Sequence, residues 1–275
     1  MTIDFTENVK RCAPGKKYSE GSCFSLQNLR DIAKQTNNKF SSVNINLNGT
    51  KKELLRGITK VLKNKYDCDD QLCWLNLDIV KDLDDSEIDN FTFRPSGPDR
   101  GTKWLNTSNI DEVLEQYQKI YPGFISFGAI PRDFSALLPL SINQPENSLE
   151  NLYNRGKFKI GIIFNHDTSG QSGSHWVAMF INLKQGDIFY FDSYGLGAKK
   201  EILEYKNKVE TFLKSKNIKP NFNSNNIRHQ FKGSECGVYS INFILRLLKG
   251  ESFEEITNNI TKDDDVNLCR RVYFT

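Results

Sequence analysis

The hydrophobic pattern of this chain changes near residue 158, and the change limits the folds that the chain can adopt. Before that point, apolar residues recur mainly at helical spacing. After it come runs rich in β-branched and aromatic residues, which are typical of strands. The strand-like runs are 158–164, 176–183 and 188–191, with 184–187 as the turn between the last two. Because helices and strands are mixed without strict alternation, we expect an α+β fold.

Helical signals dominate the first hundred residues. Apolar residues at helical spacing predict a first helix from about residue 26. Thr50 and Glu53 have the spacing of a capping box, in which each side chain binds the other residue's backbone N–H, and they predict the start of a second helix. The segment 74–83 fits a third, shorter helix.

A segment rich in proline and glycine, 95–101, divides the chain. Neither a helix nor a central strand tolerates this composition, so we expect a linker there. The predicted domains are a helical N-terminal arm domain, 1–98, and a core domain, 99–275. In the core, further helices are expected at 110–121, 200–214 and 237–248, and further short strands at 225–230 and 272–274.

Composition favours a folded protein without a nucleic-acid or membrane partner. Hydrophobic residues make up 38% of the chain, which is enough for a packed core. The net charge of +3 comes from intermixed acidic and basic residues, so no basic stripe indicates nucleic-acid binding. No apolar run reaches the length of about 18 residues that a membrane span needs. The N-terminus lacks the pattern of a secretory signal, so we do not expect a secreted protein.

Six cysteines raise the question of disulfides or zinc. In a chain of this length without a secretory signal, an even number says little, and we expect free thiols in a reducing compartment. Zinc is the weaker alternative, because the spacing gives no CxxC pair and no histidine lies nearby. We therefore expect no metal or other cofactor. The N-terminal cysteines concerned are Cys12, Cys23, Cys68 and Cys73.

Cys236 is the leading candidate for a nucleophile, because it stands at the predicted start of an apolar helix. Unpaired amides and the helix dipole at that position stabilise a thiolate. Gly237 leaves the local amides exposed and lets a substrate approach closely. These amides and the Gln230 side chain are candidates for binding the oxyanion of a tetrahedral intermediate. The structural alternatives are a small buried hydrophobe for Cys236 and a surface residue for Gln230.

His175 and Asp192 are the candidates for the base and for the group that orients it. His175 begins a strand-like run and Asp192 follows the next one, so the carboxylate could hold the imidazole in the correct tautomer. Simple hairpin geometry does not bring them together. A tight turn at Gln185-Gly186 places His175 opposite Leu196, four residues or about 13 Å from Asp192. The alternative is a core histidine and an aspartate that caps its own loop.

Three further residues have weaker roles. Trp176 is expected to be partly core, with its edge narrowing a substrate groove. His166 and His229 are expected to be structural or exposed. The polar loop 165–174 could border the cleft.

Several motifs resemble, in order and spacing, those of the Ulp/SENP SUMO proteases and the adenovirus protease. They are His175-Trp176, then Asp192-Ser193-Tyr194-Gly195, then Gln230 followed after five residues by Cys236-Gly237. The resemblance implies a papain-like core with a Cys-His-Asp triad. It assigns the nucleophile to Cys236, the base to His175, the orienting carboxylate to Asp192 and an oxyanion donor to Gln230.

A second resemblance extends over most of the chain, to polyprotein-processing proteases of the African swine fever virus type. It is carried by the segments 93–112, 174–180 and 226–237, and the Cys68-x4-Cys73 pair also has a counterpart. Asp192 is a departure, because that type has Asn at this position. The Asp brings this chain closer to the cellular SUMO proteases at the third member of the triad.

These resemblances imply a cysteine endopeptidase of a large DNA virus that cleaves after Gly-Gly in viral structural polyproteins during virion maturation. Its partner would be that protein substrate, and it would act in the host cytoplasm, in the viral factory, and in the virion. Two alternatives remain open. One is an isopeptidase that removes SUMO or ubiquitin-like modifiers, and the other is a non-catalytic module that binds a ubiquitin-like tail. The oligomeric state is not determined by the sequence.

Overall fold

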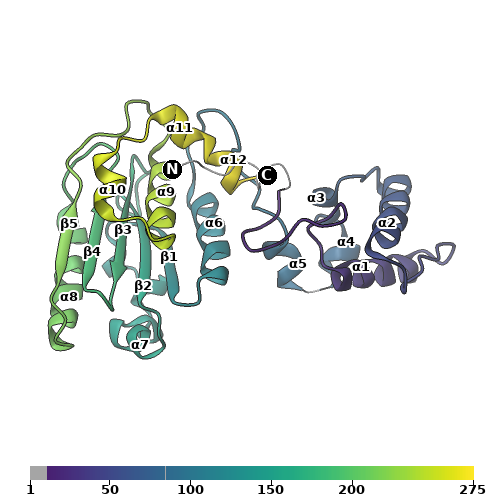
Figure 1. The fold of residues 1–275 in the computed structure, drawn as a ribbon, viewed down its shortest axis with the longest axis horizontal. Helices are drawn as coiled ribbons and strands as arrows, with labels where there is room; N and C mark the ends of the chain where they lie inside the picture. Colours follow the sequence, from purple (N-terminus) through teal and green to yellow (C-terminus); the bar gives the residue numbers. More distant parts are fainter. Residues whose placement is uncertain (1–10, 84) are drawn as a thin grey trace. The chain divides into compact units, whose positions relative to one another are not determined.

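The structure, a computed structural model, describes residues 11–83 and 85–275 (Figure 1). The chain divides into two compact units. One extends to Ser96 and includes Phe274 and Thr275, and the other spans Gly97–Tyr273. The boundary expected after residue 98 lies close to this division, but the last two residues belong to the first unit and not to the core.

The first unit is helical, as the sequence predicts. Glu53 N–H donates to Thr50 Oγ1 at 3.3 Å and Thr50 N–H donates to Glu53 Oε2 at 2.7 Å, so the capping box is confirmed. The single helix expected at 74–83 is instead two short helices, because Leu77 adopts an extended conformation between them. The helices of this unit are α1 (Leu26–Lys39), α2 (Lys51–Tyr66), α3 (Gln71–Trp74), α4 (Asp78–Lys81) and α5 (Ser86–Phe91).

The expectation of free thiols is wrong for the four N-terminal cysteines. Cys12 is bonded to Cys23 and Cys68 to Cys73, with Cα–Cα distances of 5.4 and 5.8 Å. These separations lie in the range that a disulfide requires. The expectation was based on a reducing cellular compartment. The compartment does not determine which thiols the fold brings together. The two free cysteines are Cys236 and Cys269, and both are buried.

The second unit is built on a five-stranded sheet with the order β1-β2-β3-β4-β5. β2, β3 and β4 pair antiparallel, and the outer strands β1 and β5 pair parallel to their neighbours. The three predicted runs are confirmed as β2, β3 and β4, whereas β1 was not expected. The strand expected at 225–230 is wrong, because β5 ends at Ser224. The strands are β1 (Phe124–Pro131), β2 (Lys159–Asn165), β3 (Trp176–Asn182), β4 (Asp187–Phe191) and β5 (Asn221–Ser224).

Helices cover the sheet, and their bounds follow the apolar pattern of the sequence. α6 packs along β1, and α9 packs on β3 and β2 (Figure 1). The strand expected at 272–274 is wrong, because α12 occupies Arg270–Tyr273. The helices are α6 (Thr107–Ile120), α7 (Leu149–Asn154), α8 (Lys200–Ser215), α9 (Cys236–Leu248), α10 (Phe253–Asn258), α11 (Asp263–Leu268) and α12, with short 3-10 turns at Phe134–Ala136, Ser141–Asn143 and Pro145–Asn147.

The seating of α9 on the sheet explains where the site residues lie. A Cβ on Gly161 of β2 would lie 2.9 Å from the ring of Phe124 and 3.2 Å from Ile244 of α9, so glycine gives room to both side chains here. Phe191, at the end of β4, stacks on Phe243 of α9 with ring centroids 4.9 Å apart. Because β3 and β4 are antiparallel, the start of β3 and the end of β4 meet at one edge of the sheet.

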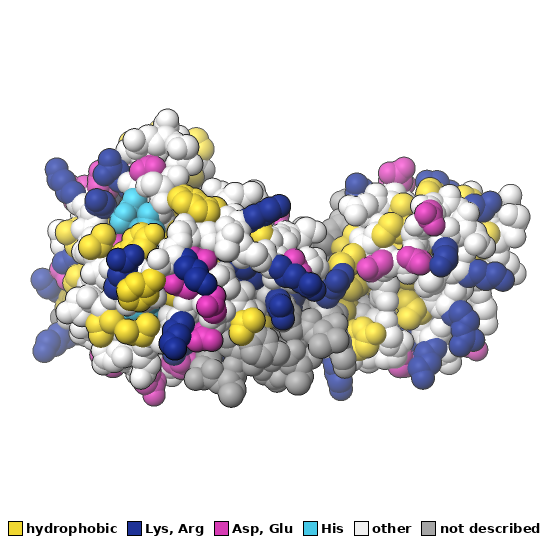
Figure 2. Space-filling view, turned by 90° about the horizontal axis from the view of Figure 1, so that it is seen from above, with side chains coloured by type: hydrophobic (Ala, Val, Ile, Leu, Met, Phe, Trp, Pro, Cys, Tyr) yellow, Lys and Arg dark blue, Asp and Glu magenta, His cyan; other side chains and the backbone are white. Residues whose placement is uncertain are grey.

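Charged side chains of both signs are intermixed on one face of the molecule. On the face drawn in Figure 2, Lys and Arg side chains lie among Asp and Glu side chains. None of the helices in the described part of the chain combines the length and apolar character that crossing a bilayer requires.

Candidate active site

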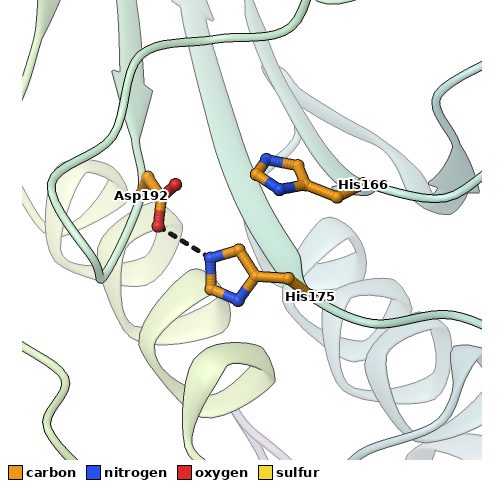
Figure 3. Close-up of side chains that lie close together, drawn as sticks. All are labelled: His166, His175 and Asp192. Atoms are coloured by element: carbon orange, nitrogen blue, oxygen red, sulfur yellow. Dashed lines mark hydrogen bonds and ion pairs between the residues drawn. The ribbon is translucent and has the colours of Figure 1, made fainter.

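A histidine and an aspartate meet at that edge of the sheet. Nε2 of His175 lies 2.7 Å from Oδ1 of Asp192, and both side chains are buried (Figure 3). The same carboxylate oxygen accepts the Tyr194 N–H at 2.8 Å. With Nε2 engaged by the carboxylate, Nδ1 is the ring nitrogen left for a reacting partner.

Asp192 is held in place through its backbone. Asn225 donates from its side-chain amide to the Asp192 carbonyl at 2.8 Å and accepts the Asp192 N–H at 2.8 Å. Both residues are buried. The Asn225 side chain thus continues the pairing of β4 and β5 one step past the end of β5, and it fixes the loop that carries the carboxylate.

The strand register differs from the simple hairpin by two residues. Asn182 faces Asp187 and Ala178 faces Phe191, so four residues form the connection, and continuing the register puts His175 opposite Tyr194, not Leu196. The remaining offset to Asp192 is two residues, or about 7 Å along a strand. A turn closes it, because the Gly195 N–H donates to the Asp192 carbonyl at 2.8 Å.

The electrostatics of His175 favour its charged form. Burial lowers the pKa of this imidazole, but hydrogen bonds to Asp192 and Cys236 and the negative charges of both outweigh burial and raise the pKa to about 9. A neighbouring anion stabilises an imidazolium in this way. The ring of Tyr194 stacks on that of His175 with centroids 4.5 Å apart, which restricts the ring's rotation.

Cys236 is the first residue of α9 and is buried. The first N–H groups of a helix have no partner within the helix, so at this position they are available to a bound group. Arg270 adds a positive charge to the surroundings of Cys236. It is fully buried, it donates to the Ser234 carbonyl at 3.1 Å, and it interacts electrostatically with Cys236 and Glu235. Arg270 was not predicted as a site residue, because no sequence motif surrounds it.

Gln230 is fully buried, which excludes the surface alternative. Its Oε1 accepts from the Ser193 hydroxyl at 2.6 Å, and its Nε2 donates to the Lys232 carbonyl at 2.8 Å. The amide therefore has one defined orientation and one N–H beyond the bond to Lys232. The oxyanion role stays a prediction that this orientation allows.

Gly237 packs against the protein and not against open space. A Cβ at this position would lie 3.0 Å from the Cβ of Leu105, so the room that glycine provides is filled by Leu105. The missing side chain therefore leaves no open room on the side of Leu105, and the expectation that a substrate approaches Gly237 stays a prediction that concerns its backbone N–H. Trp176 also contacts Leu105, because its indole N–H donates to the Leu105 carbonyl at 2.9 Å.

A groove of about 540 Å³ lies beside Trp176, the residue directly after His175. Its walls include Trp104, Pro131, Leu140 and part of the polar loop 165–174, so the expectation that this loop borders a cleft is confirmed. Trp104 is half-exposed, which is unusual for its size. The sequence analysis missed Trp104, although a tryptophan directly after the linker offered a signal.

The two other histidines differ from each other. His229 is structural, as expected: it is buried, its Nε2 faces the Thr257 carbonyl at 3.1 Å, and its Nδ1 accepts the Thr261 N–H at 3.3 Å. His166 follows β2, and its ring lies 5.0 Å from that of His175 (Figure 3). It therefore lies next to His175, a position that its sequence context did not predict.

A buried cysteine at a helix N-terminus that interacts electrostatically with a histidine held by an aspartate defines the class of thiol proteases. Comparisons with known proteins identify the family. Residues 157–274 match the Ulp1 protease family, C-terminal catalytic domain. A protein of Acanthamoeba polyphaga mimivirus that is named as a thiol protease is 36% identical over 287 residues, which cover 96% of this chain and 92% of that protein. The chain belongs to the Ulp1 family of cysteine proteases.

Proteins of African swine fever virus are also similar. The SUMO-1 cysteine protease of one isolate of this virus is 28% identical over 246 residues, covering 81% of this chain and 89% of the viral protein. The crystal structure of an African swine fever virus protease superposes with a TM-score of 0.67 at 22% identity, covering 96% of this chain and 95% of that one. The predicted fold, a papain-like α+β core of the Ulp type with a helical N-terminal arm, is thereby confirmed.

Proposed function

We propose that the protein is a viral cysteine endopeptidase with Cys236 as nucleophile, His175 as base and Asp192 as orienting carboxylate. The observation that carries this proposal is the buried pair in which Asp192 Oδ1 lies 2.7 Å from His175 Nε2, while the imidazole interacts electrostatically with Cys236. Cysteine proteases require this sequence of contacts. The site binds no cofactor in this mechanism.

The reaction proceeds in two halves. The Cys236 thiolate attacks the scissile carbonyl, and the His175 imidazolium gives its proton to the leaving amine, so that a thioester acyl-enzyme remains. Neutral His175 then takes a proton from water, which attacks the thioester and frees the carboxylate product. Asp192 keeps the ring oriented and stabilises its charged form throughout.

Charge develops on the carbonyl oxygen in both halves. The N–H groups at the start of α9 and the free N–H of Gln230 are the donors that we assign to it. Losing one such donor costs about 3–4 kcal/mol of barrier in a comparable protease. The fixed amide of Gln230 suits this role, because a donor that is already oriented needs no reorganisation during the reaction.

For the substrate we propose Gly-Gly sites in viral structural polyproteins, cut in the host cytoplasm and in the virion during maturation. Two indole side chains line the groove, Trp104 and Trp176, and Trp176 directly follows His175 in the chain. Glycines are the residues that pass most closely beside such rings. The similarity to viral proteases over most of the chain supports a viral substrate.

Removal of SUMO or a ubiquitin-like modifier is the second candidate. The observation that favours it is the Ulp1 family match together with the name SUMO-1 cysteine protease of one viral relative. Peptides with Gly-Gly-X sequences should be cut readily if the first proposal holds. Rapid turnover of SUMO-amide or ubiquitin-amide probes, with inert peptides, would decide for the modifier.

The decisive experiment compares Cys236→Ala with Cys269→Ala on a Gly-Gly-X substrate. Both cysteines are free and buried, so the pair is matched. We expect hydrolysis to vanish in the first variant and to persist in the second. Unchanged hydrolysis by Cys236→Ala would end the catalytic assignment. Tight binding of a ubiquitin-like tail without any cleavage by the unaltered protein would indicate the non-catalytic module.

A further inference from the structure

His166 gives the site a third polar side chain that the catalytic mechanism does not use. One ligand atom from each of His166, His175 and Asp192 lies within 4.8 Å of the other two (Figure 3). The three come from separate places in the chain: the end of β2, the start of β3 and the end of β4. Two imidazoles and one carboxylate form a ligand set that zinc binds in many proteins.

Two atoms of this cluster are buried without a partner. In the described part of the chain, neither Nε2 of His166 nor Oδ2 of Asp192 has a hydrogen-bond partner. Asp192 is 0% exposed, so its second oxygen is cut off from bulk solvent. Buried polar atoms are almost always satisfied, and each exception calls for an explanation.

We propose that His166, His175 and Asp192 form a binding site for a divalent transition metal, with Zn²⁺ as the fitting ion, and that its occupation switches the protease off. Two ligands of a tetrahedral zinc ion lie about 3.4 Å apart. The His175 Nε2–Asp192 Oδ1 distance of 2.7 Å would widen towards that spacing, and the longer distances, at most 4.8 Å, would shorten towards it, a movement that His166 can supply because it begins a loop. A water molecule completes the coordination in three-ligand zinc sites.

Metal binding at Nε2 removes the base from catalysis. The ion replaces the proton that His175 Nε2 shares with Asp192, and this proton leaves to solvent. The neutral ring that remains carries its one proton on Nδ1, the nitrogen that Asp192 does not engage. Such a ring has no lone pair to accept the thiol proton and cannot become an imidazolium. In this proposal zinc inhibits the enzyme without a sulfur ligand. An ion bound by Cys236 and His175 together would have one.

The inference rests on the proposed role of His175, but its first test, of zinc binding, uses neither substrate nor turnover. Binding of Zn²⁺ alone is measured by calorimetry on Cys236→Ala, with and without His166→Phe. The phenylalanine keeps a ring against His175 and removes only the nitrogens. We expect one zinc ion per chain for Cys236→Ala, and affinity lowered at least about tenfold by His166→Phe. Asp167→Asn is the control, because it removes a neighbouring carboxylate that bonds to Ser174 and lies outside the cluster.

Spectroscopy on the unaltered protein supplies the second arm. With Co²⁺ as the probe, coordination by nitrogen and oxygen alone gives visible bands without a sulfur-to-metal charge-transfer band. Absence of zinc binding by Cys236→Ala, equal affinity after His166→Phe, or a strong charge-transfer band would each overturn the proposal. Hydrolysis by His166→Phe in metal-free buffer should continue and should resist zinc concentrations that stop the unaltered enzyme.

Discussion

The hydroxyl of Ser193 donates a 2.6 Å hydrogen bond to Oε1 of Gln230, and both residues are buried. The Ser193 carbonyl also accepts the N–H groups of His229 and Gln230, each at 2.8 Å. The residue next to the orienting aspartate thus fixes the amide that we assign to the oxyanion. Ser193 therefore links Asp192, its neighbour in the chain, to Gln230, the proposed oxyanion donor.

Ser193→Ala should lower kcat by about tenfold with little change in KM, because the Gln230 amide loses its fixed orientation. Gln230→Ala should lower kcat by about 100-fold to 1,000-fold. The double variant should match Gln230→Ala alone, since the serine acts only through the amide. Alkylation of Cys236 should be unaffected by Ser193→Ala, and a parallel loss of alkylation would mean that Ser193 acts on the dyad instead.

The raised pKa of His175 predicts the alkaline side of the pH profile. Its folded-state pKa of about 9 exceeds the ordinary 6.5, so the imidazolium and its stabilising contacts are fully present below pH 6.5 and are lost as the pH rises through 9. The kcat/KM profile of the free enzyme should therefore fall near pH 9, because the leaving amine then finds no proton donor.

Asp192→Asn tests the cause of that shift. The amide keeps an acceptor oxygen for Nε2 but removes the negative charge, so the alkaline fall of kcat/KM should move down by about one to two pH units. Asp187→Asn, at the opposite end of β4, should leave the profile in place. A profile unchanged by Asp192→Asn would mean that another group sets the alkaline limb.

Gly237→Ala should destabilise the fold by about 1–3 kcal/mol, because the new Cβ would lie 3.0 Å from the Cβ of buried Leu105. Unfolding in urea followed by tryptophan fluorescence measures the free energy. Gly233→Ala is the control, since a Cβ there meets nothing within 4 Å. An equal decrease of the unfolding free energy in both variants would show that the lost backbone freedom of glycine, and not the packing of Leu105, causes the destabilisation.

The sequence predicted β2, β3, β4 and the helix of Cys236, because each follows from a local pattern. It missed β1 because that strand carries Gly128 at a positive φ of 70° and ends at Pro131, both unusual in a strand. It could not place His166 beside His175, since that proximity arises from the antiparallel pairing of β2 and β3. Long-range proximity of this kind has no signature in one segment.

The pairing register of β3 and β4 was also predicted wrongly, by two residues. The hairpin prediction counted a two-residue turn where the structure has four residues between Asn182 and Asp187. The disulfides failed for a different reason, because pairing depends on the distance between cysteines in the folded chain. Both errors concern geometry that only tertiary structure sets.

Alkylation separates the two free thiols, which are equally buried at 2% exposure. Burial raises the pKa of Cys269 to about 11, with hydrogen bonds from Tyr273 and Asn242 opposing the rise only in part. Its thiolate fraction near neutral pH is therefore on the order of one in ten thousand. Iodoacetamide should modify Cys236 at least about 100-fold faster, as followed by peptide mass spectrometry.

The four cysteines of the first unit provide an internal standard in the same experiment. They should stay unmodified until a reductant is added, since each is held in a disulfide. Cys236→Ala should lose the fast adduct and keep the slow one. Equal, slow labelling of Cys236 and Cys269 would contradict the thiolate–imidazolium pair, because a thiol without an activating histidine and helix N-terminus has no reason to react faster than its buried neighbour.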